Sequence, residues 1–243
     1  MNHILILASG SGSNAEAIVK TAQKEKWPVK FTAASDKDSD TAGVYARLKG
    51  LGVDTNYITS PLIRPIVPGV FPKPRDFSQL LEFIKRGKYD LVVMAGYMLF
   101  LPDDIVQNNK VVNIHPSILP HVYKGSKDAY QDAIDAGDLK TGCTVHIATE
   151  DYDNGPIIGQ IGFIIPQMIL DAKDVNLLRP VGLSFEHALY PECVKSVLLG
   201  KNPDMEKVVR VAIYNLTERK LSSGSIIVPS NRIAFDSWNP KVR

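Results

Sequence analysis

The chain has 243 residues, of which 44% are hydrophobic and 22% charged, and its formal net charge is +2. This length and composition suffice for one large globular domain, with or without a small appendage. The near-balanced charge, with no block of Lys and Arg, argues against a nucleic-acid-binding protein. No apolar run approaches the roughly 18 residues of a membrane-spanning helix, so we expect no membrane partner.

The N-terminal half alternates short apolar runs with helical patterns. Continuous apolar runs are typical of strands that are buried on both faces of a parallel sheet. We therefore expect strands at residues 4–8, 29–34, 53–58, 91–96 and 111–114, and helices at residues 15–26, 41–51 and 77–85. Residues 102–106 should form a short helix or a turn. Residues 61–74 contain five prolines and should form an irregular, stiff excursion.

The C-terminal half continues the alternation and then changes character. We expect a helix at residues 127–136, strands at 142–149 and 157–165, and helical structure at 175–199 that is broken at Pro180. Beyond Gly200 we expect only short strands, at residues 208–213 and 226–228. The pattern predicts an α/β, Rossmann-like fold with a mostly parallel twisted sheet and helices on both faces. Residues 1–200 would form this domain and residues 201–243 a small C-terminal extension without an independent core.

Two further features concern the compartment of the protein. The chain runs from Met1 directly into an apolar stretch without a basic segment or an Ala-x-Ala motif, so we expect no signal peptide. Cys143 and Cys193 are far apart and belong to no CxxC pair or Cys/His cluster, which favours two reduced, buried thiols and no metal site. We expect a cytoplasmic protein, either a monomer or a homodimer.

A glycine- and serine-rich loop, residues 9–14, joins the first predicted strand to the first helix. Such loops let backbone N–H groups at a helix start approach an anion, and Ser13 and Asn14 add side-chain donors, so we expect a phosphate here. The pattern Gly-x-Gly-x-x-Ala from Gly10 also fits a dinucleotide-binding fingerprint, with Asp36 as the ribose-binding acid. A tight turn without a ligand is the third interpretation.

Asn113 and His115 are two residues apart at the end of a predicted strand, so their side chains share one face at the ligand-binding edge of the sheet. Either side chain could instead serve only the loop backbone. Asp153 lies in an Asp-Asn-Gly-Pro sequence, which is good turn chemistry. That turn connects two predicted strands, and it could also carry a carboxylate to the sheet edge.

Six segments occur together in the order found in one enzyme family. They are Ser9–Asn14 (SGSGSN), Met94–Met98 (MAGYM), Asn113–Pro120 (NIHPSILP), Gly142–His146 (GCTVH), Asp153–Ile158 (DNGPII) and Glu186–Pro191 (EHALYP). With these segments the chain resembles the phosphoribosylglycinamide formyltransferase family, part of the wider formyltransferase superfamily, over about residues 1 to 200. The resemblance implies formyl transfer from 10-formyltetrahydrofolate to the amine of a small phosphorylated substrate in purine biosynthesis.

The resemblance also implies roles for individual residues. Substrate binding falls to the residues that would hold its phosphate, Gly12, Ser13 and Asn14, and to Glu186, which would bind the ribose hydroxyls. Folate binding falls to Met98, Leu99, Phe100, Leu101 and Asn113, with Arg75 at the glutamate tail. The chain departs from the family in four places. Leu99 stands where arginine is common, and Ser126–Tyr130 replaces a stretch that usually contains histidine. The proline-rich excursion at residues 61–74 is longer than usual, and the tail beyond Gly200 has no counterpart in the family.

Asn113, His115 and Asp153 would form the catalytic group. When an amine attacks a formyl carbon, negative charge develops on the formyl oxygen, and Asn113 and a protonated His115 could donate to it. Asp153 would raise the pKa of His115 and favour its protonation. His115, Asp153 and a water molecule would move the proton from the amine to the folate nitrogen, and no metal is required.

Other formyl acceptors, and a protein without catalytic activity, are also compatible with parts of the sequence. With water as acceptor the protein would be a formyltetrahydrofolate hydrolase, and with another amine it would be a related formyltransferase. A formyltransferase acting on methionyl-tRNA is disfavoured by the glycine loop. A dinucleotide-binding module without chemistry gives no reason for Asn113, His115 and Asp153 to occur in these contexts.

Overall fold

The computed structural model describes residues 1–63, 73–120, 122–126 and 128–223, and it divides into two compact units. The first unit comprises Met1–Asn113 with Ala148–Glu150, and the second comprises Ile114–Ile147 with the described residues from Asp151 onward. The strand order is β3-β2-β1-β4-β5-β6-β7, and the pairs β2–β3, β1–β2, β1–β4 and β4–β5 are parallel. The predicted α/β class with a mostly parallel sheet is confirmed.

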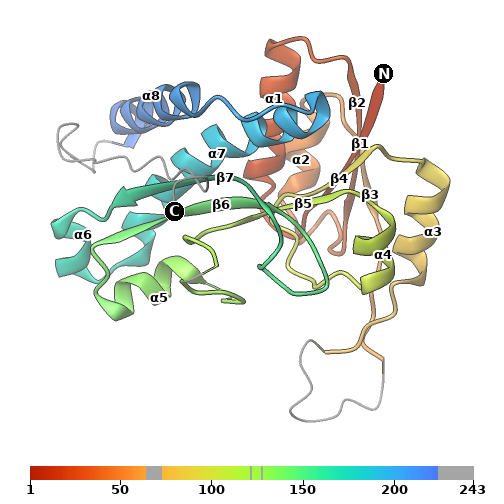
Figure 1. The fold of residues 1–243 in the computed structure, drawn as a ribbon, viewed down its shortest axis with the longest axis horizontal. Helices are drawn as coiled ribbons and strands as arrows, with labels where there is room; N and C mark the ends of the chain where they lie inside the picture. Colours follow the sequence, from red (N-terminus) through yellow and green to blue (C-terminus); the bar gives the residue numbers. More distant parts are fainter. Residues whose placement is uncertain (64–72, 121, 127, 224–243) are drawn as a thin grey trace. The chain divides into compact units, whose positions relative to one another are not determined.

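The first unit alternates strands and helices (Figure 1). Its strands are β1 (Asn2–Leu7), β2 (Val29–Ser35), β3 (Thr55–Tyr57), β4 (Leu91–Met94) and the start of β5 (Val111–His115). Its helices are α1 (Ser13–Lys24), α2 (Val44–Lys49), α3 (Ser78–Gly87) and α4 (Asp103–Asn108). Every element that the sequence predicts in this half is present, with shifts of a few residues at the ends.

The apolar runs form strands because both of their faces are covered. Ile4–Leu7 and Leu91–Val93 are almost fully buried, and one face packs with Leu80, Ile84 and Ile105 in a shared core. β1 pairs with β2 on one side and with β4 on the other. The strand order therefore reverses at the end of β1, which is where open parallel sheets bind their ligands.

The second unit is built around a long helix. It contains the end of β5 and then α5 (Ala129–Ala136), β6 (Lys140–Ile147), β7 (Ile157–Ile164), α6 (Gln167–Ala172), α7 (Val175–Leu199) and α8 (Met205–Ser223). β6 and β7 form an antiparallel pair, with Thr144 opposite Gln160. α7 lies against both of these strands and also contacts α5 and α8 (Figure 1).

The predicted break of α7 at Pro180 was wrong. A proline inside a helix removes one backbone hydrogen bond and costs about 3 kcal/mol or more. α7 nevertheless continues through Pro180 and Pro191, because most of its residues beyond Leu178 are buried. The energy of this burial outweighs the local penalty of the two prolines.

The predicted strand at residues 208–213 was also wrong, because this segment belongs to α8. Its β-branched residues favour a strand locally, but Val208 and Ala212 are one helical turn apart, are both fully buried, and lie in a helix that packs on α7. The other predicted strand, at residues 226–228, and residues 64–72 of the proline-rich excursion lie outside the described residues. The predicted domain boundary at residue 200 stays a prediction.

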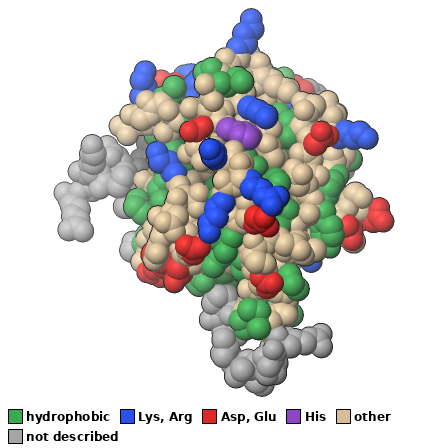
Figure 2. All heavy atoms as spheres, turned by 90° about the vertical axis from the view of Figure 1, so that its right-hand side faces the viewer, with side chains coloured by type: hydrophobic (Ala, Val, Ile, Leu, Met, Phe, Trp, Pro, Cys, Tyr) green, Lys and Arg blue, Asp and Glu red, His purple; other side chains and the backbone are tan. Residues whose placement is uncertain are grey.

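On the face in Figure 2, basic and acidic side chains are interspersed, so neither sign of charge forms a continuous field there. Within the described parts of the chain, no helix is both long and apolar enough to cross a membrane. Cys143 and Cys193 are free and buried, as predicted.

Candidate active site

The glycine loop leads from β1 into α1, and its geometry suits an anion. Gly12 is the N-cap of α1 with a φ of 76°, a left-handed conformation that favours glycine. Because Gly12 has no side chain, it supplies no acceptor for the first N–H groups of α1. The N-terminus of a helix whose first N–H groups lack a side-chain acceptor can bind phosphate through those N–H groups and the positive end of the helix dipole. Ser13 and Asn14 are the first two residues of the same turn.

Replacing Gly12 with alanine should destabilise the fold by on the order of 1–3 kcal/mol, because the left-handed conformation is strained for other residues. A Cβ at this position would also lie 2.7 Å from atoms of Val44. At Gly10 an added Cβ would meet nothing within 4 Å, so Gly10→Ala is the matched control. Denaturant unfolding measures both variants, and equal losses of stability would contradict this account of Gly12.

The loop after β4 is tied to the glycine loop. The Ser9 N–H donates to the carbonyl of Gly96 at 3.0 Å, and the Met98 N–H donates to the Ser9 hydroxyl oxygen at 2.9 Å. Ser9 is buried, so both hydrogen bonds are shielded from water. These contacts fix the start of the segment that the resemblance assigns to folate binding.

That segment presents an apolar surface. Met98 is 63% exposed, Leu99 and Phe100 are partly buried, and Leu101 belongs to the core. Arg75, assigned to the folate tail, donates from Nη1 to the carbonyl of Ser60 at 2.6 Å. The guanidinium has five N–H donors, so this bond leaves it able to bind a carboxylate as well.

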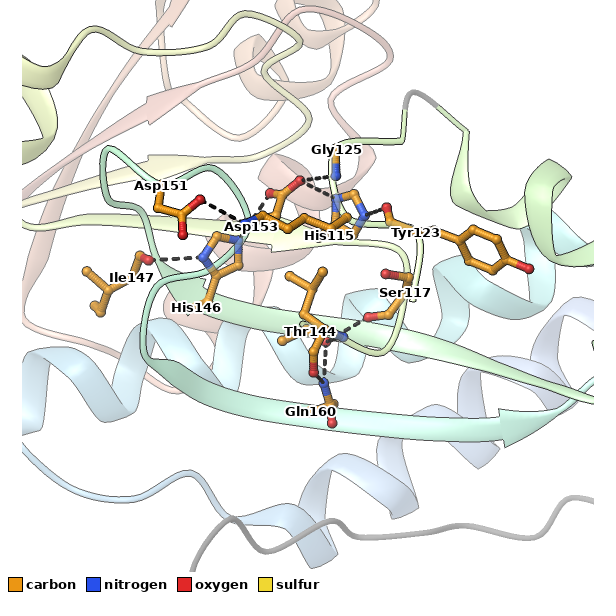
Figure 3. Close-up of polar contacts among 12 residues, drawn as sticks. His115, Ser117, Tyr123, Gly125, Thr144, His146, Ile147, Asp151, Asp153 and Gln160 are labelled. Carbon is orange, nitrogen blue, oxygen red and sulfur yellow. Dashed lines mark hydrogen bonds and ion pairs between the residues drawn. The ribbon is translucent and has the colours of Figure 1, made fainter. Parts of the chain in front are cut away.

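His115 ends β5 and is held by two contacts (Figure 3). Its Nε2 lies 2.9 Å from the carbonyl oxygen of Tyr123, and its Nδ1 lies 3.4 Å from Oδ2 of Asp153. A carbonyl oxygen only accepts, so Nε2 carries a hydrogen and Nδ1 faces the carboxylate. Asn113 is two residues earlier in β5, which directs both side chains to one face of that strand.

Asp153 lies between two histidines. Besides His115, its Oδ1 is 3.6 Å from Nε2 of His146, and its Oδ2 accepts from the N–H of Gly125 at 3.0 Å. Asp153 has a φ of 52°, a left-handed conformation that Asp and Asn tolerate better than most residues. The turn that the sequence predicts around Asp153 therefore aims its carboxylate at His115.

His146 belongs to one of the motifs that the chain shares with the family, but the resemblance assigns it no role. His146 is 2% exposed, and its Nδ1 lies 3.0 Å from the carbonyl oxygen of Ile147, which fixes the orientation of the ring. The signal that could have identified it is its spacing in β6. His146 is two residues from Thr144 and therefore on the same face of a buried strand.

Thr144 and Gln160 support the chain that follows His115 (Figure 3). The Thr144 hydroxyl donates to the carbonyl of Ser117 at 2.7 Å and accepts from the N–H of Leu119 at 3.1 Å. Gln160 Nε2 donates to the Thr144 hydroxyl at 2.7 Å and to the carbonyl of Leu119 at 2.9 Å. These groups are buried and mutually satisfied, so the segment after β5 is held in one conformation.

The predicted effect of Asp153 on the pKa of His115 is present, but it does not decide the direction of the net shift. Burial lowers the pKa of His115 below its ordinary value, and this effect outweighs the carboxylate of Asp153 and the Tyr123 carbonyl, which both raise it. Asp153 therefore acts in the predicted direction, but it is the weaker influence. A His115 side chain with a pKa below about 6.5 is mostly neutral at neutral pH.

For the pKa of Asp153, contacts with neighbouring groups outweigh the effect of burial. Burial raises the pKa of its carboxyl group, but the contacts with His146, His115 and the Gly125 N–H together lower it below the ordinary value. Asp153 is therefore ionised at neutral pH. The site pairs a carboxylate with a neutral imidazole that can accept a proton.

Glu186 lies in α7 and is 6% exposed, and its Oε1 accepts from the hydroxyl of Tyr130 at 2.9 Å.

In the described residues no group of three or more His, Cys, Asp and Glu side chains could hold a metal ion.

A model of the family described as formyl transferase matches residues 2–194. The chain belongs to the formyl transferase family. The resemblance noted from the sequence is therefore confirmed.

Relatives within the family carry a more specific name. The chain is 32% identical over 211 residues to phosphoribosylglycinamide formyltransferase of Bacillus subtilis, covering 85% of this chain and all of the relative. It is 30% identical to the enzyme of the same name from Escherichia coli, covering 78% of this chain and 84% of that one. A crystal structure of glycinamide ribonucleotide transformylase 1 from Symbiobacterium toebii matches with a TM-score of 0.68 and 31% identity, over 82% of this chain and 89% of that chain.

The residues that the formyl transferase resemblance selects are distributed over both units. The first unit contains Gly12, Ser13, Asn14, Arg75, Met98, Leu99, Phe100, Leu101 and Asn113, and the second contains His115, Asp153 and Glu186. Direct contact is established for His115 and Asp153.

Proposed function

We propose that this protein transfers the formyl group of 10-formyltetrahydrofolate to the amine of phosphoribosylglycinamide, a step of purine biosynthesis. Family membership supports the reaction class, and the names of its relatives support the acceptor. The observation that carries the proposal is the contact of buried His115 with partly buried Asp153, because this pair provides the proton-accepting group that amine formylation requires.

The proposal assigns two chemically distinct groups of the acceptor to different residues. Its phosphate binds at the start of α1, to Gly12, Ser13 and Asn14, where backbone N–H groups and the helix dipole favour an anion. Its ribose hydroxyls donate to the carboxylate of Glu186.

The residues of the folate segment fit an apolar heterocycle with a charged tail. Met98 exposes an apolar side chain, and Leu99 and Phe100 are only partly buried, so together they offer apolar surface that a flat ring system would cover. The guanidinium of Arg75 matches a tail carboxylate. 10-formyltetrahydrofolate supplies the activated formyl group.

In the reaction a bond forms between the acceptor nitrogen and the formyl carbon, and the bond from that carbon to the folate nitrogen breaks. Asn113 donates from its amide to the formyl oxygen as negative charge develops there. The attacking amine loses one proton, and the folate nitrogen gains one. The pair of Asp153 and neutral His115 receives this proton through a water molecule, stores it at His115 Nδ1 and returns it.

This chemistry requires no metal, because the donor nitrogen leaves with a proton and the amine is itself a nucleophile. We further propose that the protein acts in the cytoplasm, as a monomer or a homodimer, on small molecules rather than nucleic acid. Size-exclusion chromatography with light scattering measures the oligomeric state.

The proposal predicts that deformylation of 10-formyltetrahydrofolate depends on the acceptor. The measurement follows folate absorbance with purified protein, with and without phosphoribosylglycinamide, and mass spectrometry identifies the formylated product. Turnover without the acceptor would instead indicate the hydrolase. Absence of turnover with this acceptor would contradict the proposed substrate.

A further inference from the structure

A buried hydrogen bond joins α5 to the proposed ribose-binding carboxylate. The hydroxyl of Tyr130 donates to Oε1 of Glu186 at 2.9 Å, and the two residues are 4% and 6% exposed. A hydrogen bond from a neutral donor to a buried carboxylate is stronger than one between neutral groups. Neither this bond nor Tyr130 has a part in the reaction described above.

The helix opposite Tyr130 is shaped to receive its ring. Gly182 lies four residues before Glu186, so both residues are on the same side of α7. A Cβ on Gly182 would lie 2.3 Å from Cζ and the hydroxyl oxygen of Tyr130. Glycine weakens a helix interior relative to alanine, and here it leaves the space through which the Tyr130 hydroxyl reaches Glu186.

A second contact holds α5 against α7 close to this point. Asp128 caps the start of α5 by accepting from the Gln131 N–H, and it forms an ion pair with Arg179 of α7. Arg179 is three residues before Gly182, on the preceding turn. The backbone next to Tyr130 is therefore held to α7 by the ion pair of Asp128 with Arg179, and the Tyr130 side chain is held to α7 by its own hydroxyl.

We infer that Tyr130 is a positioning residue that fixes the carboxylate of Glu186 for the ribose diol and thereby favours ribose over 2-deoxyribose acceptors. This inference rests on the proposed function, which assigns the ribose to Glu186. A carboxylate has roughly four lone-pair sites, so Glu186 can accept from Tyr130 and from ribose hydroxyls at the same time.

The electrostatics of the pair keep Tyr130 in its donor form. Burial and the nearby charge of Glu186 raise the pKa of the Tyr130 hydroxyl well above its ordinary value, so it stays protonated throughout the physiological range. Its single proton is directed to Oε1, which restricts the rotation of the carboxylate. A carboxylate whose orientation is already fixed binds a diol without losing that freedom on binding.

The test is Tyr130→Phe, which keeps the ring and removes the hydroxyl. We expect the KM for phosphoribosylglycinamide to rise about tenfold, since hydrogen bonds to charged groups have this order of effect, while kcat and the KM for the folate change little. The preference for this acceptor over its 2-deoxyribose analogue should fall by a similar factor. Tyr89→Phe, in the first unit, is the matched control and should change none of these values.

Gly182→Ala provides a second variant, because the added Cβ displaces the Tyr130 ring. It should reduce the ribose preference in the same direction as Tyr130→Phe. Unfolding midpoints are measured for all variants. An unchanged ribose preference in both variants, or an equal loss for both acceptors that follows lost stability, overturns the inference.

The wild-type protein separates this inference from the proposed function. If it formylates neither acceptor, the proposed function fails, and calorimetric binding of ribose 5-phosphate and 2-deoxyribose 5-phosphate still tests Tyr130. A wild-type preference for ribose 5-phosphate that Tyr130→Phe removes supports the inference. Equal binding of the two sugars by the wild type overturns it.

Discussion

Replacing Asp153 with asparagine should lower kcat/KM for formyl transfer by about 10²–10⁴-fold, the usual contribution of general acid–base catalysis. The substitution removes the charge that stabilises a proton on His115 and changes little else. Asparagine tolerates the left-handed backbone at this position, and its amide oxygen can still accept from the Gly125 N–H. The variant should therefore fold normally, and steady-state kinetics with both substrates measures the loss.

Asp153→Asn should also shift the pH dependence of kcat/KM toward lower pH. In the wild type, His115 must be neutral to accept a proton, so activity falls as the pH drops through its pKa, which lies below the ordinary value. Asp153 raises that pKa, so removing its charge lowers it further. The acid limb of the kcat/KM profile should move to lower pH, while the plateau also falls.

Asp151→Asn is the control for this experiment. Asp151 lies two residues away, is exposed, and pairs with Lys124 at 2.8 Å. The identical change of charge there should leave both the rate and the pH profile unaltered. Normal activity in Asp153→Asn, or an acid limb that does not move, would remove Asp153 from the proton pathway.

Replacing Asn113 with alanine should lower kcat by about 10²–10³-fold, the typical effect of removing one donor to a developing oxyanion. Because this hydrogen bond strengthens only as charge develops on the formyl oxygen, kcat and kcat/KM should fall together while KM stays nearly constant. Asn113 lies in the centre of β5 between buried neighbours, so its backbone is fixed by the sheet rather than by its side chain.

Asn108→Ala, at the exposed end of α4, is the matched control and should have wild-type kinetics. Asn113→Asp gives a further comparison, since it keeps the shape but replaces the amide donor with an acceptor. It should be at least as slow as the alanine variant. A rise in KM at constant kcat for Asn113→Ala would instead assign Asn113 to ground-state binding.

Local patterns in the sequence were sufficient to predict the strands and helices of the first unit. Ile4–Leu7 and Leu91–Met94 are continuous apolar runs, and such runs are stable only where both faces of a strand are covered, as in a parallel sheet. The turn at Gly12 could also be predicted from the sequence, because few residues other than glycine adopt its conformation. The prediction that Asn113 and His115 share one face follows from the two-residue period of a strand.

The resemblance to a family also predicted that two motifs far apart in the chain act together. His115 and Asp153 were assigned to one catalytic group only through the resemblance to a family, since nothing local brings residues 38 positions apart together. The structure places the His115 ring 3.4 Å from the Asp153 carboxylate. Whether the remaining predicted residues act as assigned stays a prediction.

Only the tertiary structure decided the features that depend on burial. The prolines of α7 and the β-branched residues of α8 oppose the local conformation that is observed, and packing between these helices outweighs them. The direction of the His115 pKa shift follows from how completely its ring is removed from water, a quantity that sequence spacing does not contain. The contacts of His146 with Asp153 and of Tyr130 with Glu186 likewise join distant segments, so they exist only once the chain has folded.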